Sequence, residues 1–267
     1  MRHFSSISPT PTSPGTRLAL TVLAAALAAL CANGQGRGPG RGGPPPTAKA
    51  AAPIDMTGYW VSVVTEDWRY RMVTPPKGDY QSVPMTAESR KVADAWDPTK
   101  DEAAGEQCKS YGVAGIMRIP GRLHITWQDD DTLKMEIDAG TQTRLFHFGN
   151  WKSPGGEPTW QGDSVARWEF AGRGGPPGAE PPSGNLKVIT THLKAGYLRK
   201  NGVPYSANAV FTEYYDIVRE HTGDLWLILT SVVDDPQYLR EPFMISTHYR
   251  KQADASGWDP TPCSARW

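Results

Sequence analysis

The sequence lacks an excess of charge of either sign. Its 267 residues include 28 Lys and Arg against 28 Asp and Glu, so the formal net charge is zero. A protein whose main partner is nucleic acid needs a basic surface to neutralise phosphates, and no basic block is present. The composition therefore argues against nucleic acid as a partner. The hydrophobic share of 39% is large enough for a folded core and excludes wholesale disorder.

Apolar runs of membrane-spanning length are also missing. Residues 18–30 are thirteen apolar or small residues, which suits the core of a signal peptide and is too short to cross a bilayer. Arg2 and Arg17 supply positive charge before this run, and the small residues at 32–34 fit a cleavage site. We therefore expect residues 1–34 to be a signal peptide.

Cleavage there would leave a mature chain that starts near Gln35 and is periplasmic or secreted, with no membrane span. A lipoprotein anchored at Cys31 is the less favoured alternative. Leu30 stands directly before this cysteine, where a lipoprotein signal needs a small residue.

Cysteine is scarce, with three residues at positions 31, 108 and 263. Removal of the leader leaves Cys108 and Cys263, and two cysteines in an oxidising compartment most simply form one disulfide. The bond would close a loop of roughly 155 residues, worth on the order of 4–5 kcal/mol in the chain-entropy model. A catalytic thiol is the alternative, but no histidine lies near Cys108 in the sequence.

The six histidines are dispersed and form no H-x-H or H-x-x-x-H pair, so we predict neither a metal site nor a cofactor. His124, Glu136 and His147 lie on three successive predicted strands, which leaves their convergence geometrically open. A set of cross-strand polar pairs is the alternative interpretation.

Glycine and proline are abundant, with 27 and 24 residues, and they concentrate in two segments. Residues 35–53 have no hydrophobic periodicity and are predicted to be a disordered Gly/Pro-rich linker. Residues 172–184 lie between two strand-like runs and are predicted to be a mobile loop. Residues 54–267 are then expected to be a single folded domain.

Between these segments, alternation of apolar and polar residues predicts about nine β-strands. They cover residues 59–65, 122–127, 132–138, 141–148, 164–170, 186–193, 209–219, 225–233 and 243–250. One short helix is predicted over Ala87–Trp96, capped by Thr86 and stopped at Asp97-Pro98. Short turns in meander order favour an all-β fold, a single antiparallel β-barrel, because closure removes exposed sheet edges.

The triplet Gly58-Tyr59-Trp60, which opens the first strand, resembles the G-x-W signature of lipocalins. In that family the tryptophan plugs the closed end of the barrel and a late arginine often packs on it. Arg250 is the residue of this sequence that matches the arginine. The resemblance implies a structural role for Trp60 and no catalytic one.

A longer resemblance covers residues 54–263. The segments that carry it are Trp96-Asp-Pro, Cys108-x-x-x-Gly112, Met117-x-x-Pro120-Gly-Arg122, Asp138–Arg144, Thr159–Glu169 and Asp234-Asp-Pro-x-x-Tyr238. They are similar to an uncharacterised family of exported bacterial proteins with a lipocalin-like β-barrel. This similarity implies fold and export and assigns no activity. The chain departs from the family after Trp168-Glu169, where the Gly/Pro-rich insertion replaces a tight turn.

Two acidic residues lie among aromatic ones, Glu169 next to Trp168 and Glu213 between Phe211 and Tyr215. The two-residue period of a strand puts Phe211, Glu213 and Tyr215 on one face. If that face points into the barrel, Glu213 would be a desolvated acid with a raised pKa, able to act as a general acid or base. A structural ion pair, with Arg144 or Arg167 as partner, is the alternative.

The aromatic residues are the strongest compositional clue to function. Ten Trp, ten Tyr and six Phe are more than a small barrel needs for its core, which favours a cavity for a small apolar or aromatic molecule. Simple core filling is the alternative. The residues expected to bind such a ligand are Trp127, Arg144, Phe146, Trp168, Phe211 and Tyr215.

Ligand binding is therefore the leading functional hypothesis. An enzyme on the same barrel is the second, with cyclase, isomerase or hydratase chemistry by Glu213 or Glu169 beside His124, His147 or His192. An envelope protein that acts through contacts with partners is the third. The sequence predicts neither the ligand's identity nor the oligomeric state.

Overall fold

The computed structural model describes residues 44–171 and 183–266. The predicted signal peptide with Cys31, residues 35–43 of the predicted linker and residues 172–182 of the predicted loop lie outside this range. The described residues from Pro46 onward form one compact unit. Within the described ranges, no helix combines the length and apolar content that crossing a membrane requires.

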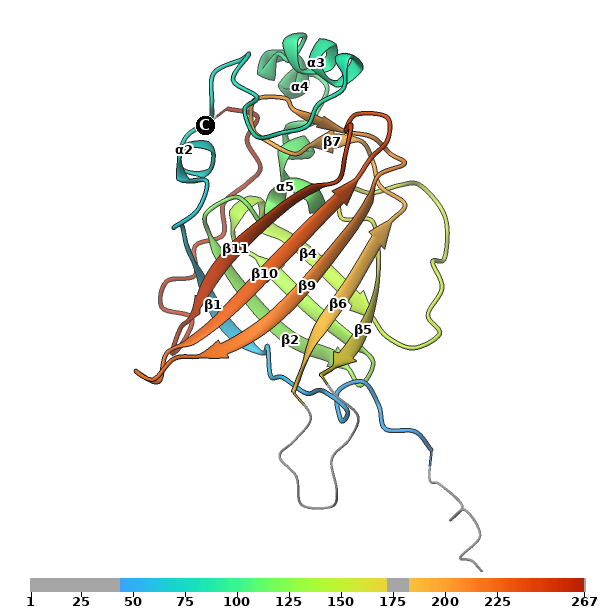
Figure 1. Ribbon diagram of the computed structural model, residues 1–267, viewed down its shortest axis with the longest axis vertical. Helices are drawn as coiled ribbons and strands as arrows, with labels where there is room; N and C mark the ends of the chain where they lie inside the picture. The colour runs from blue at the N-terminus through green and yellow to red at the C-terminus, as the bar shows by residue number, and fades with distance from the viewer. Residues whose placement is uncertain (1–43, 172–182, 267) are drawn as a thin grey trace, which may run out of the picture. The chain divides into compact units, whose positions relative to one another are not determined.

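Nine strands close into one barrel in the described part of the chain (Figure 1). They are β1 (Gly58–Val63), β2 (Arg122–Asp129), β3 (Thr132–Ile137), β4 (Gln142–His147), β5 (Asp163–Phe170), β6 (Gly184–Thr191), β9 (Val210–Arg219), β10 (Leu225–Asp234) and β11 (Phe243–Lys251). The order around the barrel is β1-β11-β10-β9-β6-β5-β4-β3-β2, and β1 pairs with β2 to complete the ring. The predicted nine-stranded barrel is confirmed.

One strand pair departs from the prediction of a purely antiparallel barrel, because β4 and β5 run parallel. Residues 148–162 carry the chain along the outside from the end of β4 back to the end where β4 began (Figure 1). A parallel neighbour needs such a return crossing, whereas a tight turn gives an antiparallel one. The expectation is wrong at this pair because alternation along a strand does not say where a long connection leads.

The prediction of a single helix is also incomplete. The predicted helix is present as α3 (Ala87–Asp94), and the Thr86 hydroxyl caps it by accepting from the backbone N–H of Ser89 at 3.1 Å. Three further short helices occur in the described residues, α2 (Trp68–Arg71), α4 (Pro98–Ala103) and α5 (Val113–Ile116), with 3₁₀ turns η1 (Gln107–Tyr111) and η2 (Ala139–Thr141).

Helix α4 begins where the sequence was expected to stop a helix. The Asp97 carboxylate accepts from the N–H of Thr99 at 3.0 Å, and Pro98 takes the first helical position, where its missing N–H costs nothing. Helices α2 and α5 have four residues each. That is barely one turn, so they show no apolar period.

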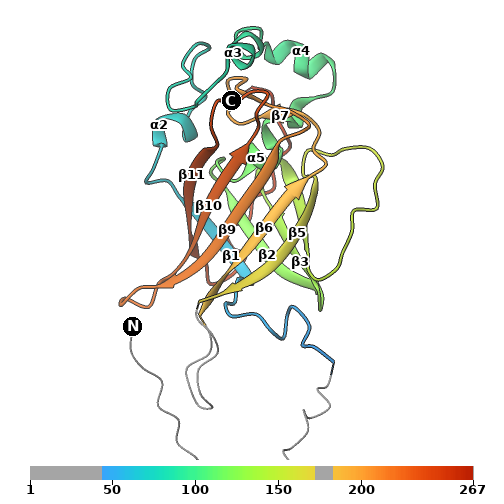
Figure 2. The same cartoon turned by 45° about the vertical axis from the view of Figure 1, so that its right-hand side comes forward.

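The barrel has two ends that differ in how they are closed. We call the end at which β1 stops and β2 starts the upper end, and the end with the β2–β3 turn at residues 130–131 the lower end. At the upper end α3, α4, α5 and the hairpin of β7 (Gly196–Tyr197) and β8 (Pro204–Tyr205) form a cap (Figure 2). A buried cluster that includes Val113, Leu198 and Phe211 joins this cap to the strands.

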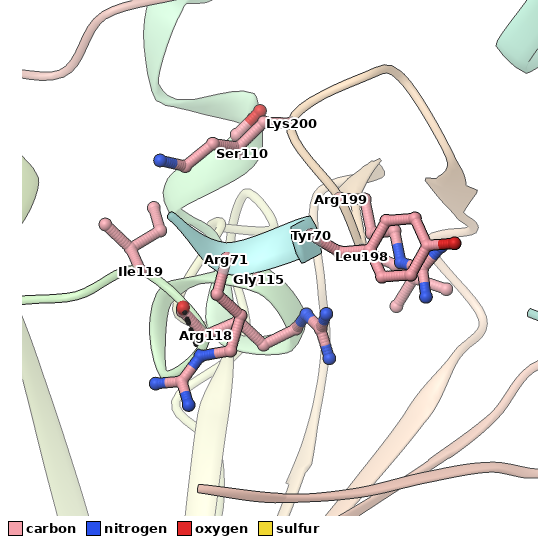
Figure 3. A pocket seen from close by; sticks show the side chains of 9 residues that line it. All are labelled: Tyr70, Arg71, Ser110, Gly115, Arg118, Ile119, Leu198, Arg199 and Lys200. Carbon is pink, nitrogen blue, oxygen red and sulfur yellow. Dashed lines mark hydrogen bonds between the residues drawn. The ribbon is translucent and has the colours of Figure 1, made fainter. Parts of the chain in front are cut away.

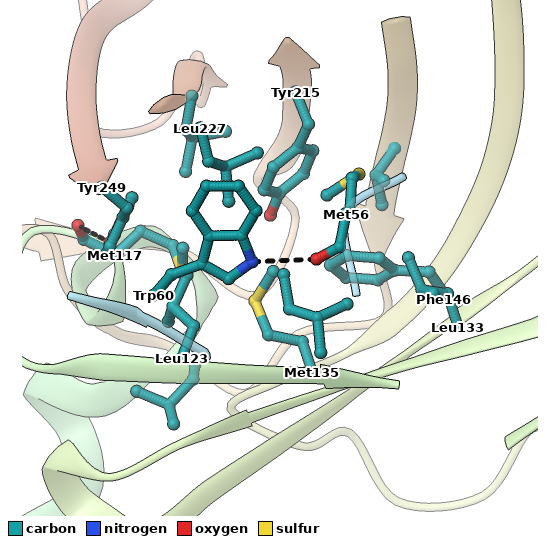
Figure 4. Packing of buried hydrophobic residues seen from close by; sticks show 14 of the residues in the cluster. Met56, Trp60, Met117, Leu123, Leu133, Met135, Phe146, Tyr215, Leu227 and Tyr249 are labelled. Atoms are coloured by element: carbon teal, nitrogen blue, oxygen red, sulfur yellow. Dashed lines mark hydrogen bonds between the residues drawn. The ribbon is translucent and has the colours of Figure 1, made fainter. Parts of the chain in front are cut away.

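The interior between the two ends is filled by side chains (Figure 4). Trp60 is fully buried, and its indole Nε1 donates to the backbone oxygen of Met56 at 2.9 Å. Lys251 is the register partner of Trp60, and its Nζ lies 4.5 Å from the centre of the indole ring. The cation over Trp60 is thus Lys251, while Arg250, which the G-x-W resemblance suggested, is exposed.

The predicted disulfide between Cys108 and Cys263 is present, with the two Cα atoms 5.1 Å apart. It ties the C-terminal tail to η1, beside the cap. The bond spans 155 residues of sequence, so in the unfolded chain it closes a loop that contains most of the barrel.

Replacement of both cysteines by serine is expected to lower the free energy of unfolding by about 5 kcal/mol in the chain-entropy model. Urea denaturation followed by far-UV circular dichroism measures this loss. The oxidised wild-type protein treated with dithiothreitol is the matched control and should show a similar loss. A loss below about 1 kcal/mol in both samples would contradict the cross-link's stabilising role.

Candidate functional site

Four of the predicted site residues meet inside the barrel. Arg144 and Phe146 point inward from β4, and Glu213 and Tyr215 point inward from β9, each at most 1% exposed. The Arg144 guanidinium donates through Nη1 to Glu213 Oε1 at 2.8 Å and through Nη2 to Oε2 at 2.5 Å. The Tyr215 hydroxyl also donates to Oε1, at 2.8 Å. The shared inward face predicted for β9 is therefore correct.

Both oxygens of Glu213 are occupied by donors of the protein itself. Burial works to lower the pKa of Arg144, but the charge of Glu213 outweighs it and the pKa is raised. Burial and the same carboxylate raise the pKa of the Tyr215 hydroxyl. The Phe146 ring centre lies 5.7 Å from that of Tyr215 and 4.9 Å from the Arg144 Cζ atom. This group is a structural ion pair, which the sequence left open as an alternative.

The predicted acid–base partners lie on the other side of the barrel wall. Because Leu123 and Phe146 point into the core, their neighbours His124 and His147 point outward. His192 follows β6 and bonds through Nδ1 to Asp163 at 2.8 Å. The structure thus does not bring a histidine to Glu213.

The outer face pairs the remaining candidates locally. His124 stacks on Tyr59 with ring centres 4.1 Å apart and bonds to Glu136 at 3.1 Å. Its expected third partner, His147, lies opposite Thr132 in the register of β3 and β4 and stacks on Trp151 instead.

Glu169 pairs with Arg167 on the same strand at 2.8 Å, also on the outer surface. Among the residues that the structure describes, no three His, Cys, Asp or Glu side chains gather as a metal site would require.

The other predicted ligand-binding residues separate to different places. Phe211 lies in the buried cluster of the cap. Trp127 and Trp168 lie at the lower end, where they meet Phe148, which follows β4. Ring centres are 5.2 Å apart for Phe148 and Trp168, 5.7 Å for Trp127 and Phe148, and 6.4 Å for the two tryptophans. We call these three rings the aromatic mouth.

Residues 46–57, which we call the strap, lie across the aromatic mouth. The Trp168 indole donates to the backbone oxygen of Ala48 at 2.8 Å. The N–H groups of Ala48 and Lys49 donate to the β2–β3 turn, to the Asp131 carboxylate at 2.7 Å and to the Asp130 backbone oxygen at 3.0 Å. Residues 46–53 belong to the predicted linker, and here they rest on the barrel.

Sequence reasoning missed this contact because the strap uses backbone groups and small side chains, which leave no period. Beside it is an open hollow of about 440 Å³. Its apolar lining comes from Pro46, Ala48, Ala51, Phe148, Val165, Ala166, Trp168 and Phe170. Phe170 is 48% exposed, so an aromatic face is accessible from solvent at this place.

No family model, curated protein or solved structure matches this chain.

Replacement of Glu213 by Gln is expected to cost about 3–5 kcal/mol of stability, because it leaves the Arg144 guanidinium buried without a counter-charge. The control is Glu169→Gln, which breaks a solvent-exposed pair and should cost less than about 1 kcal/mol. Chemical denaturation of both variants measures their losses in the free energy of unfolding. Equal losses would mean that the interior pair has no special role.

Proposed function

We propose that this protein is a small-molecule-binding barrel, and that its ligand is apolar or aromatic and binds at the aromatic mouth. The observation that carries this proposal is the clustering of Trp127, Phe148 and Trp168 at the lower end of the barrel, which no strand or helix of the described residues caps. The ligand thus belongs at the rim, and not deep in the barrel where Arg144, Phe146 and Tyr215 were expected to hold it.

The chemistry of the rings supports a planar, weakly polar ligand. Trp127 and Trp168 are half-buried, so each indole leaves part of its face open to a stacking partner. Aromatic pairs at these separations favour tilted or offset contacts, and a flat ring system can extend such a cluster. The nearby hollow has a volume within the range of small-molecule sites.

The strap supports the same location. Its contact with the mouth rests on a few hydrogen bonds and on alanine and isoleucine side chains, with Ala48 and Ile54 packed against the core. Residues 46–53 of the strap have mainly small side chains, whereas Met56 anchors the end of the strap in the core. A ligand can therefore gain contact with the aromatic faces by a small movement of residues 46–53.

Export and kinship with lipocalin-like barrels are part of the proposal. The disulfide supports an oxidising compartment. The closed nine-stranded barrel and the buried Trp60 of the opening triplet support the family resemblance.

Titration with N-phenyl-1-naphthylamine, an apolar dye that fluoresces when shielded from water, tests the site. The wild-type protein should give saturable fluorescence, and Trp127→Ala and Trp168→Ala should each weaken binding roughly tenfold by removal of a stacking face.

Trp68→Ala is the matched control, because Trp68 is 66% exposed on α2 at the upper end. Its affinity for the dye should equal that of the wild type. The proposal fails if the wild type shows no saturable signal, or if the Trp68 variant loses as much affinity as the other two.

A further inference from the structure

A second site lies at the upper end of the barrel, where three arginines are buried around a small pocket (Figure 3). Arg71 comes from α2, Arg118 follows α5, and Arg199 lies at the tip of the β7–β8 hairpin. Their exposed fractions are 1%, 4% and 3%. Three segments distant in sequence thus bring guanidinium groups to one place, which Ser110 and Lys200 also line.

The protein satisfies these guanidinium groups only in part. Arg71 donates through Nε to the backbone oxygen of Arg118 at 2.9 Å (Figure 3) and through Nη1 to Glu66. Arg118 donates through Nη2 to Asp67. These bonds hold the side chains of Arg71 and Arg118 in place. They leave one further nitrogen of each guanidinium group without a hydrogen bond to the protein.

Four nitrogen atoms of the same three side chains have no hydrogen-bond acceptor: Arg71 Nη2, Arg118 Nη1, and Nε and Nη2 of Arg199. Arg199 Nη2 is 3.8 Å from the Asp67 carboxylate, within ion-pair range only. Buried donors normally find partners. The other unpaired buried arginine nitrogens of the described chain occur singly, as Arg122 Nε and Arg144 Nε. Within the described residues, the pocket is therefore the place where several such nitrogens lie together.

Positive charge exceeds negative charge around the pocket. Three buried arginines, Arg71, Arg118 and Arg199, face two carboxylates there, those of Glu66 and Asp67. His248 also contacts Glu66, at 3.1 Å. A bound anion would balance this excess.

The titration behaviour of the basic groups agrees with the excess charge. Burial lowers the pKa of Arg118. Burial, with repulsion from Arg118, lowers that of Arg199 to about 10. Burial also lowers the pKa of Lys200 to about 8. The shifts of Arg118 and Arg199 show that burial disfavours their charged forms more than the nearby carboxylates favour them.

We propose that this pocket binds an oxyanion group through Arg71, Arg118 and Arg199. The guanidinium fork matches the oxygens of carboxylate, phosphate and sulfate, which accept two parallel hydrogen bonds. Stacking of Arg199 on Tyr70, with Cζ 4.1 Å from the ring centre, holds one fork in orientation.

The free volume of about 10 Å³ is that of one water site, so one oxygen of the anion enters and the rest of the ligand stays at the mouth of the pocket. This site is independent of the aromatic mouth, because it lies at the opposite end of the barrel and recognises charge.

Calorimetric titration with sodium phosphate, sulfate and acetate, at constant ionic strength set with chloride, tests the proposal. Saturable binding of any of the three supports it, and the order of affinities distinguishes a tetrahedral anion from a carboxylate. Arg199→Gln should weaken binding roughly tenfold or more by removal of two charge-assisted donors. Arg69→Gln is the matched control and should stay within about twofold, because Arg69 is 56% exposed and pairs with Asp79.

Thermal unfolding without added oxyanion separates binding from structure. Arg199→Gln relieves the repulsion between Arg199 and Arg118 but loses the hydrogen bond from Arg199 Nη1 to the backbone oxygen of Gln81 at 2.6 Å. Its Tm should therefore stay within about 5 °C of that of the wild type. Arg118→Gln provides a second binding variant if Arg199→Gln does not fold. The proposal is overturned if the wild type binds none of the three anions, or if the pocket variants bind them as tightly as Arg69→Gln does.

Discussion

The ion pair between Arg144 and Glu213 is the interaction on which the rest of the structure depends. It joins β4 to β9 across the inside of the barrel and is fully buried. Two charges removed from water are tolerable only when they pair closely and are hydrogen-bonded. The bidentate geometry, with Tyr215 as third member, gives both Glu213 oxygens a donor and leaves only Nε of Arg144 without an acceptor. The apolar side chains around the pair then complete a solid interior. Because these side chains pack together in the middle of the barrel in the described part of the chain, we expect ligands to bind elsewhere.

Function is therefore expected at the ends, and the two ends have opposite chemistry. The lower end offers aromatic faces under a thin strap of backbone and small side chains. The upper end is closed by a helical cap, and the seam between α2, α5 and the β7–β8 hairpin holds a surplus of buried guanidinium groups. Uncharged stacking surfaces and buried cations select different ligands, so one barrel can carry both sites without competition between them.

Much of the fold follows from the sequence because it is encoded locally. Alternation marks the nine strands, and the inward face of Phe211, Glu213 and Tyr215 follows from the two-residue period. The pairing of Cys108 with Cys263 follows from the count of cysteines that remains if residues 1–34 are a cleaved leader, as the sequence predicts. The parallel contact of β4 and β5 could not be predicted, since it depends on the path of residues 148–162, which have no pattern.

The sites were harder to predict because they depend on three-dimensional coincidence. Aromatic content pointed to Trp127 and Trp168, but nothing in the sequence separates them from Phe146 and Tyr215, which are core residues. The arginine pocket combines positions 71, 118 and 199, each unremarkable beside its sequence neighbours. The strap was hidden in a segment whose composition is typical of a linker.

The central claim is that the barrel interior is filled and that small molecules bind only at its ends. Two-dimensional NMR of the isotope-labelled protein, titrated first with N-phenyl-1-naphthylamine and then with phosphate, tests it most directly. The account predicts that the dye shifts the indole N–H signals of Trp127 and Trp168, that phosphate shifts the Arg199 Nε–H signal, and that the backbone amides of Phe146 and Tyr215 stay in place. Large shifts of those two amides with either ligand would show entry into the barrel and would contradict the account.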